Sequence, residues 1–480
     1  MSYAKKTMFS SAWGVGLGLV NQLCSLIVFV ILSRYLSVQE FGLVALCFLV
    51  TEMLVSLSNF GVNQLLIQRP YWSDRFASSC FKLVLFVSLI FSLLMIFVAA
   101  PLAEQFFLEG SFSLLSLLSL VPLISSISNV SVAKLLRKFD NRTVTLVNSI
   151  STISSSILTL VLVYLDFGVI SVVFGRLFQS ALATCTFQFV SPFIPNYEYR
   201  KLHRKKILAF GIPVFGQIFL TFISSRVVNF VSLFMLGSTA FAFVSVAQRA
   251  IRLTTEVTVT PLNGVLLQSF SRVKHDASLE ASYIRVVKIA SFIIYPMFVG
   301  LSTLSAEVIY ILFGDKWLES ANLLSILCYT VVVSLPIWFL PTILVARAQT
   351  RTVLKLNIIS SCIAILSTAI GAFYSMEGLV YAALFASIIT IPIKIKLIEK
   401  HVQMRYIKVI LSCVPSLIAS LMMAISITHL DLAAFFDSNV YFELITKVGI
   451  GFLLYIVFSF VVFRKNTIDV LNEFKMVIAK

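Results

Sequence analysis

The sequence predicts an all-α polytopic membrane protein with about fourteen transmembrane helices, built as two parallel six-helix repeats around a central cleft plus two extra C-terminal helices. Three observations lead to this fold class. Apolar residues make up 59% of the 480-residue chain, whereas soluble domains are roughly 45–50% apolar. Long apolar runs recur along the whole chain. Thirty of its 37 Lys and Arg residues fall at every second junction between those runs.

Each transmembrane helix is predicted from one apolar run, because a helix needs roughly 20 apolar residues to cross the hydrocarbon core. The first run is too long for the apolar part of a cleavable signal peptide and lacks a small-residue cleavage site. After the last run, Val470, Phe474 and Val477 share one helical face, so we expect the tail 464–480 to lie on the inner membrane surface. The predicted spans are residues 9–33, 41–60, 79–101, 113–133, 143–165, 168–190, 207–236, 241–263, 286–306, 321–346, 352–374, 378–398, 406–429 and 441–463.

Basic residues set the predicted topology, because Lys and Arg are retained on the cytoplasmic side of a membrane. The opposite junctions carry mostly acids, and only Arg34, Lys316 and Lys447 are basic there. An even number of spans with both termini in the cytoplasm follows. The basic junctions are 5–6, 69–82, 134–142, 200–206, 272–288, 347–355, 394–408 and 464–480.

Composition and motifs exclude several classes of function. The net charge of +16 is spread over the junctions, so we expect no nucleic-acid partner. The cysteines and histidines are scattered singly, so we expect neither a disulfide nor a metal site. The chain has no Gly-rich phosphate-binding loop and no zinc-protease or serine-hydrolase motif, so we expect no enzyme of those kinds and no cofactor.

An internal repeat relates the two halves of the chain. Residues 142–151 read RTVTLVNSIS and residues 351–360 read RTVLKLNIIS. Coincidence among apolar residues is the alternative explanation. Six spans separate the copies, so the two halves share one orientation and are expected to flank a substrate site near the membrane midplane. The predicted division is an N-terminal lobe at 1–206 with helices 1–6, a C-terminal lobe at 207–400 with helices 7–12, and helices 13–14 with a cytoplasmic tail at 401–480.

Four arginines fall inside the predicted spans rather than between them: Arg176, Arg226, Arg249 and Arg252. A charge at the centre of a membrane helix costs roughly 2.5–3.5 kcal/mol on insertion scales, so such residues normally face a cavity or a partner. The arginines outnumber the acids near them. Because Arg binds phosphate through a bidentate fork, this excess suits an anionic group such as phosphate or pyrophosphate.

Span 8 carries the most distinctive polar pattern. Gln248, Arg252 and Glu256 recur at every fourth residue, with Arg249 beside them, which gives one polar stripe on an otherwise apolar helix. We expect this stripe to face a cavity. The structural alternative is that Arg252 pairs with Glu256 and that the other arginines cap neighbouring helices.

Further polar residues are predicted to lie at similar depth in the cleft. Asn21 and Gln22 belong to span 1 and Asn229 to span 7. Glu52 in span 2 is the repeat equivalent of Arg252, so we expect the two to face each other. Either Glu52 or Glu256 could couple a transport cycle to an ion gradient by protonation.

Six segments carry motifs with a recognisable order: SRYLSVQEFGLVAL (33–46), NFGVNQLLIQR (59–69), LLRKFDNR (135–142), SVAQRAIRL (245–253), LLQSFSRVKHD (266–276) and LFGDKW (312–317). Together they resemble the oligosaccharide flippase (Wzx-type) family of bacterial polysaccharide exporters, in the colanic-acid-exporter-like branch of the multidrug/oligosaccharidyl-lipid/polysaccharide exporter superfamily. The resemblance runs in family order over about residues 8–400.

The resemblance implies a flippase that turns undecaprenyl-diphosphate-linked oligosaccharide from the inner to the outer leaflet of the bacterial cytoplasmic membrane by alternating access. It implies that helices 1, 2, 7 and 8 line the cleft and that Arg226, Arg249 and Arg252 hold the diphosphate, with Arg176 as a further candidate. The expected partners are the lipid-linked oligosaccharide, membrane lipids, and a polysaccharide polymerase with its chain-length proteins.

Two other functions compete with this hypothesis. The first is a cation-coupled multidrug antiporter of the same superfamily, which the cationic cleft disfavours. The second is a membrane glycosyl polymerase or ligase, which the short outer junctions disfavour, because such an enzyme needs a sizeable outer loop to hold its catalytic groups.

Overall fold

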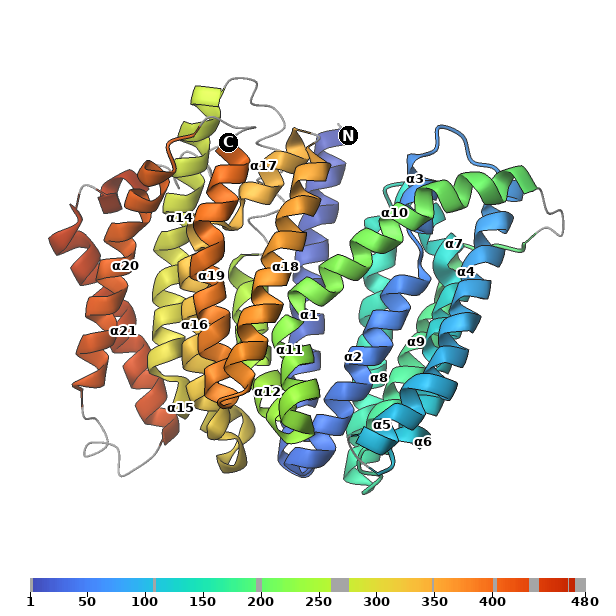
Figure 1. Ribbon diagram of the computed structural model, residues 1–480, viewed down its shortest axis with the longest axis horizontal. Helices are drawn as coiled ribbons and strands as arrows, with labels where there is room; N and C mark the ends of the chain where they lie inside the picture. Colours follow the sequence, from blue (N-terminus) through green and yellow to red (C-terminus); the bar gives the residue numbers. More distant parts are fainter. Residues whose placement is uncertain are drawn as a thin grey trace. The chain divides into compact units, whose positions relative to one another are not determined.

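The computed structural model of the chain is helical almost throughout the residues that it describes (Figure 1). No strand occurs among these residues, and thirteen of their helical segments are long and apolar enough to cross a membrane. Val20–Tyr35 adds a shorter apolar helix. The predicted all-α membrane fold with about fourteen spanning helices is therefore confirmed. The described residues are 3–106, 109–195, 201–259, 276–347, 349–399, 404–430, 440–464 and 466–470.

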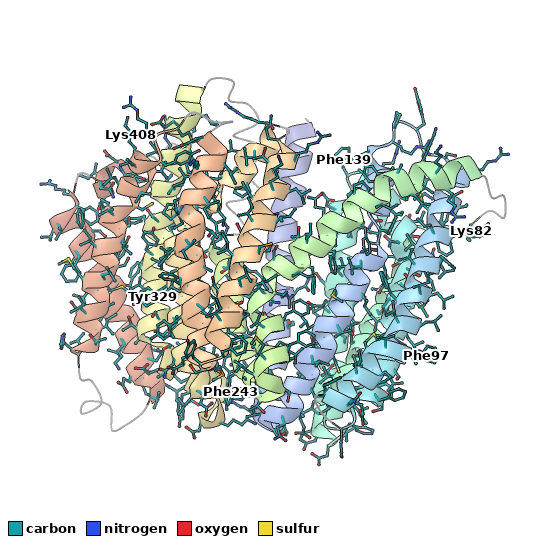
Figure 2. All side chains as sticks on the ribbon, in the orientation of Figure 1. Lys82, Phe97, Phe139, Phe243, Tyr329 and Lys408 are labelled. Atoms are coloured by element: carbon teal, nitrogen blue, oxygen red, sulfur yellow. The ribbon has the colours of Figure 1, made fainter. Side chains whose placement is uncertain are left out.

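Many large apolar side chains lie on the outside of the helices rather than in a core. Phe97 is 73% exposed, and Figure 2 places it on the surface of its helix. Exposed aromatic and aliphatic side chains on this scale are typical of helices whose outer faces contact lipid. The tail beyond residue 470, including Phe474 and Val477, lies outside the described residues, as does most of the 266–276 segment.

The helices pack into two compact units, of which unit 1 comprises Met1–Ser225 and Gly237–Ala242. Within it, α8 packs against both α1 and α9, and α7 packs against α4 and α9. The helices of unit 1 are α1 (Tyr3–Tyr35), α2 (Val38–Ser58), α3 (Val62–Gln68), α4 (Asp74–Leu94), the π-helical turn η1 (Met95–Ala99), α5 (Ala100–Phe106), α6 (Ser111–Leu118), α7 (Leu120–Arg137), α8 (Asn141–Tyr164), α9 (Ile170–Val190) and α10 (Lys201–Ser225).

Local sequence signals explain where several of these helices begin. Ser37 and Glu40 form a reciprocal capping box at the start of α2, in which Glu40 Oε2 accepts a 2.8 Å hydrogen bond from the Ser37 backbone N–H. Ser73 caps α4, and Asp140 caps α8 by accepting from the Thr143 backbone N–H. These side chains satisfy backbone donors that the first helical turn leaves unpaired.

A tight break separates α2 from α3. Phe60 and Gly61 both adopt left-handed backbone conformations, with φ of 46° and 69°. Beside the break, Asn129 Nδ2 of α7 donates a hydrogen bond to Asn59 Oδ1. Such a conformation is rare for a bulky residue, so the packing around Phe60 must hold it in place.

Helix α10 packs closely against this break, and glycines form the contact on both sides. A Cβ at Gly211 would lie 2.2 Å from Phe60 Cε1, and a Cβ at Gly61 would lie 2.5 Å from Val214 Cγ1. Phe60 also packs against Phe215, with ring centroids 5.6 Å apart. Small residues that let helices approach this closely are typical of membrane-protein interfaces.

Gly211→Ala is expected to destabilise the protein, although alanine favours a helix over glycine by about 1 kcal/mol. The added methyl group must displace the Phe60 ring, and such overpacking costs roughly 1–3 kcal/mol. Gly216→Ala is the matched control on the same helix, because a Cβ there meets no atom within 4 Å. Thermal unfolding in detergent should show a lower midpoint for the first variant and an unchanged or higher midpoint for the second. Equal midpoints for the two variants would contradict a tight contact between Gly211 and Phe60.

Unit 2 comprises Arg226–Leu236 and Phe243–Lys480. These units describe packing, whereas the division at residues 206 and 400 describes the repeat and stays a prediction. The helices of unit 2, counting α12 although it begins in unit 1, are α11 (Val227–Val231), the π-helical turn η2 (Ser232–Leu236), α12 (Gly237–Thr258), α14 (Asp276–Thr303), α15 (Ser305–Phe313), the 3₁₀ turn η3 (Asp315–Trp317), α16 (Glu319–Trp338), α17 (Leu340–Ala346), α18 (Thr350–Ala372), α19 (Met376–Glu399), α20 (Tyr406–Thr428) and α21 (Val440–Val462).

An ionic cluster joins the last helix to the rest of unit 2. Lys447 Nζ of α21 lies 2.9 Å from Glu307 Oε1 of α15 and 2.7 Å from Glu443 Oε1. Tyr455 of α21 donates a 2.9 Å hydrogen bond to the Phe292 carbonyl of α14. The predicted outward position of Lys447 is thus accompanied by two carboxylates that compensate its charge inside an apolar helix.

Candidate functional site

The polar stripe predicted on span 8 lies on α12. The first part of this helix is buried, and Phe243 anchors it in unit 2: its carbonyl accepts a 3.0 Å hydrogen bond from Ser320 Oγ, and its ring packs edge-on against Trp317. The polar part of the helix follows this anchor. Gln248, Arg249, Arg252 and Glu256 are all half-buried, as is expected of side chains that border a polar space rather than lipid.

One part of the structural alternative, the pairing of Arg252 with Glu256, is not observed in the described part of the chain. Among the residues that the structure describes, Glu256 forms no ion pair, so an Arg252–Glu256 pair does not account for the charges on α12. Arg249 and Arg252 each make other interactions.

Arg226 lies at a break in its helix rather than inside one. It caps α11 with a non-helical backbone (φ −124°, ψ 17°), and α10 ends one residue before it. Three residues on, Asn229 is only 4% exposed, and its Oδ1 has no hydrogen-bond partner. Discontinuous transmembrane helices with unpaired polar groups are typical of substrate sites in transporters. The prediction of an uninterrupted span at 207–236 is corrected here, because the π-helical turn and the break interrupt it.

Four of the predicted residues lie in unit 1, and two of them, Asn21 and Arg176, belong to helices that pack on α8. Asn21 Nδ2 of α1 donates a 3.0 Å hydrogen bond to Ser149 Oγ of α8. One turn further along α8, Thr152 Oγ1 accepts a 2.9 Å bond from Gln179 Nε2 of α9. Arg176 Nη1 completes the series with a 2.8 Å bond to Gln179 Oε1. A polar ladder therefore runs from α1 through α8 to α9.

A close helix approach makes this ladder feasible. A Cβ at Gly175 would lie 1.9 Å from Thr159 Oγ1, so α8 and α9 are almost in backbone contact next to Arg176. Two atoms of ladder residues, Asn21 Oδ1 and Arg176 Nε, are buried without a hydrogen-bond partner. The same holds for Nε2 of Gln22, the residue next to Asn21. Buried unpaired donors and acceptors are costly, so they indicate a place where a ligand or water binds.

Arg176 has no carboxylate partner among the described residues, and its side-chain hydrogen bond goes to the neutral amide of Gln179. Sequence reasoning identified Arg176 but missed Gln179, Thr152 and Ser149. The spacing of Arg176 and Gln179, one helical turn apart, was the available signal.

Glu52 is half-buried on α2 of unit 1 and has interactions of its own. Its predicted position opposite Arg252 of unit 2 stays a prediction. No group of three His, Cys, Asp or Glu side chains among the described residues is arranged to hold a metal ion.

Comparison with known proteins identifies relatives of this chain. A family model described as "Polysaccharide biosynthesis protein" matches residues 31–322. The chain is 26% identical over 305 residues to the succinoglycan biosynthesis transport protein ExoT of Rhizobium meliloti, which covers 62% of this chain and 60% of that relative. It is 19% identical over 382 residues to the lipopolysaccharide biosynthesis protein WzxC of Escherichia coli, covering 77% of this chain and 76% of the relative.

Solved structures share the fold. The lipid II flippase MurJ, in an inward closed conformation, matches with a TM-score of 0.74 at 20% identity, covering 96% of this chain and 99% of its own. An inward-facing multidrug resistance MATE family transporter of the MOP superfamily matches with a TM-score of 0.62 at 16% identity, covering 78% and 92%. Both are transporters, and at these identities the likeness establishes the fold.

Proposed function

Because the chain belongs to the polysaccharide biosynthesis protein family, we propose that it is a flippase for lipid-linked oligosaccharide. The substrate class is an undecaprenyl-diphosphate-linked oligosaccharide, and the direction is from the inner to the outer leaflet of the bacterial cytoplasmic membrane. The product would serve the assembly of a surface polysaccharide such as O-antigen, capsule or exopolysaccharide.

One observation carries this proposal. Arg176 is a cation within a membrane-spanning helix whose described partner is a neutral amide. Burying a charge in the membrane without a counter-charge is unfavourable, so its retention is best explained by an anionic ligand. The diphosphate of a lipid-linked saccharide supplies that charge, and Arg249 and Arg252 on α12 add two more cations for it.

In this proposal the diphosphate binds among Arg226, Arg249 and Arg252, and Arg176 is a further candidate to bind it. The polar stripe on α12 contributes to a wet path for the glycan, while the polyprenyl tail stays in lipid. Alternating access then moves the bound head group, and protonation of Glu52 or Glu256 couples the cycle to an ion gradient.

Two observations disfavour the competing functions, the charge of the candidate residues and the length of the junctions. A cation-coupled drug antiporter needs a majority of acids at its site, whereas the candidate residues contain four arginines and two glutamates. A membrane polymerase or ligase needs catalytic groups in an outer domain. The junctions predicted to be outer are short where the structure describes them, as at 165–169 between α8 and α9.

The proposal is tested with purified protein in liposomes that contain a radiolabelled polyprenyl-diphosphate oligosaccharide in both leaflets. Periodate, which does not cross the membrane, is added outside to oxidise the glycan diols. We expect the protected inner pool to become accessible only when the protein is present. A protected pool of the same size in protein-free liposomes and in protein-containing liposomes would refute flipping.

A further inference from the structure

Arg69 lies in unit 1 where α3 ends and the chain turns toward α4. Its guanidinium carbon lies 3.7 Å from the centroid of the Phe76 ring, and Phe76 is only 2% exposed. Helix α3 also packs against α7, so the end of α7 borders this turn (Figure 1). The basic junction 69–82 predicts that this end of unit 1 lies on the cytoplasmic side.

The guanidinium group of Arg69 has unused hydrogen-bond donors. The side chain is half-buried, and none of its N–H groups has an acceptor among the described residues; Nη1 is fully buried. Stacking on Phe76 uses the face of the guanidinium group and leaves the donors at its edge available to an oxyanion in the same plane. Because a buried charged donor without an acceptor is costly, such a group indicates a bound ligand or water.

Arg137 of α7 fixes the backbone from which the Arg69 side chain starts. Its Nη1 donates hydrogen bonds to the carbonyl oxygens of Leu66, at 3.0 Å, and of Arg69, at 2.7 Å. Its Nη2 donates a 2.9 Å hydrogen bond to the Pro70 carbonyl. A second helix therefore holds the turn on both sides of Arg69, as is expected of a preorganised binding residue.

The positive charges at this end of unit 1 are not neutralised by nearby acids. Arg137 and Lys134 donate to backbone carbonyls, and neither forms an ion pair among the described residues. The junctions 69–82 and 134–142 contain one acid each. Asp74 accepts a 2.8 Å hydrogen bond from Trp72 Nε1, and Asp140 caps α8. Both acids thus have other partners, and the field around Arg69 stays positive.

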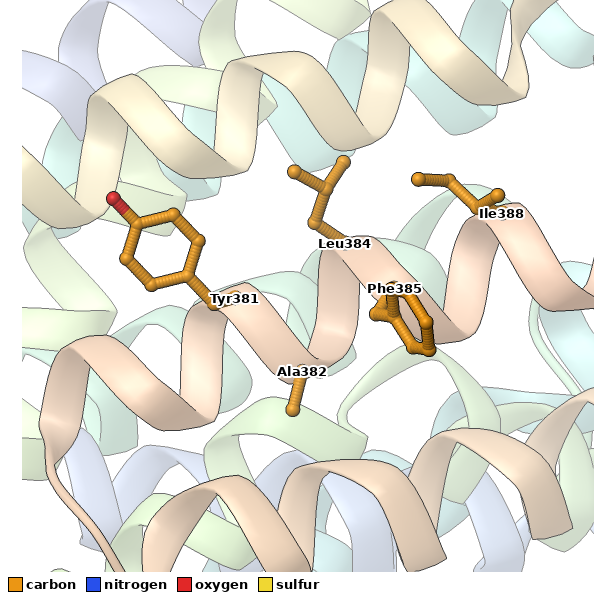
Figure 3. Close-up of a pocket in the computed structure, with 5 residues that line it drawn as sticks. All are labelled: Tyr381, Ala382, Leu384, Phe385 and Ile388. Carbon is orange, nitrogen blue, oxygen red and sulfur yellow. The ribbon is translucent and has the colours of Figure 1, made fainter.

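The apolar hollow on α19 of unit 2 lacks these properties (Figure 3). Tyr381 supplies the only polar side-chain atom of its lining, and no cation belongs to that lining. The hollow therefore contains no group that would bind an anion. Its lining consists of Tyr381, Ala382, Leu384, Phe385 and Ile388.

We propose that Arg69 binds a phosphate group at this end of unit 1, with Arg137 and Lys134 adding positive charge. None of these three residues belongs to the proposed diphosphate site. Arginine suits phosphate because its planar fork donates two parallel hydrogen bonds. The phosphate comes either from the head group of an acidic lipid of the inner leaflet or from a soluble phosphate ion, which share this chemistry.

The site is tested by thermal unfolding of the full-length protein in detergent after partial delipidation. Sodium phosphate is compared with sodium chloride at equal ionic strength, and phosphatidylglycerol with diacylglycerol, which has the same chains but no phosphate. We expect a phosphate-containing ligand to raise the midpoint. A rise with sodium phosphate identifies a soluble ion, and a rise with phosphatidylglycerol alone identifies a lipid head group. Arg69→Gln should weaken binding of that ligand about tenfold to hundredfold, because a charge-assisted hydrogen bond is lost.

Arg351→Gln is the matched control, because Arg351 is an exposed arginine on α18 of unit 2. It should respond to the ligand as the wild type does. Arg69→Lys keeps the charge but loses the fork, so its affinity should be intermediate, and it tests the site even if Arg69→Gln does not fold.

Two results would overturn the proposal. One is that neither phosphate-containing ligand raises the midpoint more than its phosphate-free counterpart. The other is that both Arg69 variants keep the wild-type affinity, in which case stacking on Phe76 is the whole role of Arg69. None of these readouts depends on transport, so the outcome is independent of whether the protein flips a saccharide.

Discussion

Arg252→Ala is expected to abolish export of the surface glycan while the amount of protein in the membrane stays normal. Truncation removes a bidentate donor from the proposed diphosphate site. A hydrogen bond to a charged group contributes roughly 1.5–3 kcal/mol, which corresponds to about a tenfold to hundredfold loss of affinity. The glycan is quantified on the cell surface, and the protein by immunoblotting of isolated membranes.

Two further variants separate binding from folding. Arg252→Lys keeps the charge but loses the fork, so export should be intermediate. Arg285→Ala removes an exposed arginine from α14 of the same unit and should leave export unchanged. Unchanged export in Arg252→Ala would remove Arg252 from the site, and equal losses in both alanine variants would indicate a general effect of charge on the inner face.

Most helix boundaries could be predicted from the apolar runs, because the membrane allows few alternatives to a continuous helix. The predicted span 406–429 corresponds to α20 at Tyr406–Thr428, and 441–463 corresponds to α21 at Val440–Val462. The prediction was wrong at Arg226 and at Ser232–Leu236, where the helix breaks or changes its winding inside one apolar run. Apolar residues continue through η2, so hydropathy does not detect this π-helical turn.

The candidate residues could be predicted individually but not as sets. An arginine inside an apolar run stands out, which is why Arg176 and Arg252 were identified. Their partners do not stand out, because α8 contains many Ser and Thr residues and only the rotation of the helix selects Thr152 to accept from Gln179.

The second large effect is expected at Arg176, where transport and stability should move in different directions. Arg176→Met removes a cation from a membrane helix, where a charge costs roughly 2.5–3.5 kcal/mol on insertion scales. Among the described residues its side chain bonds to an amide, that of Gln179, and to no carboxylate. The thermal midpoint should therefore stay the same or rise. Transport of the lipid-linked saccharide should fall at least about tenfold, because the anion loses a charge-assisted contact.

Gln179→Leu provides the contrast for this prediction. It removes the hydrogen bond between α8 and α9 and leaves Thr152 without its donor. The free energy of unfolding should therefore fall by about 1 kcal/mol, and the thermal midpoint should fall with it. The charge of Arg176 remains in that variant, so transport should fall less than in Arg176→Met. If Arg176 only joined the two helices, both variants would lose stability together. If Arg176→Met lowers the midpoint and transport falls only as much as the loss of folded protein explains, Arg176 has a structural role and does not bind the anion.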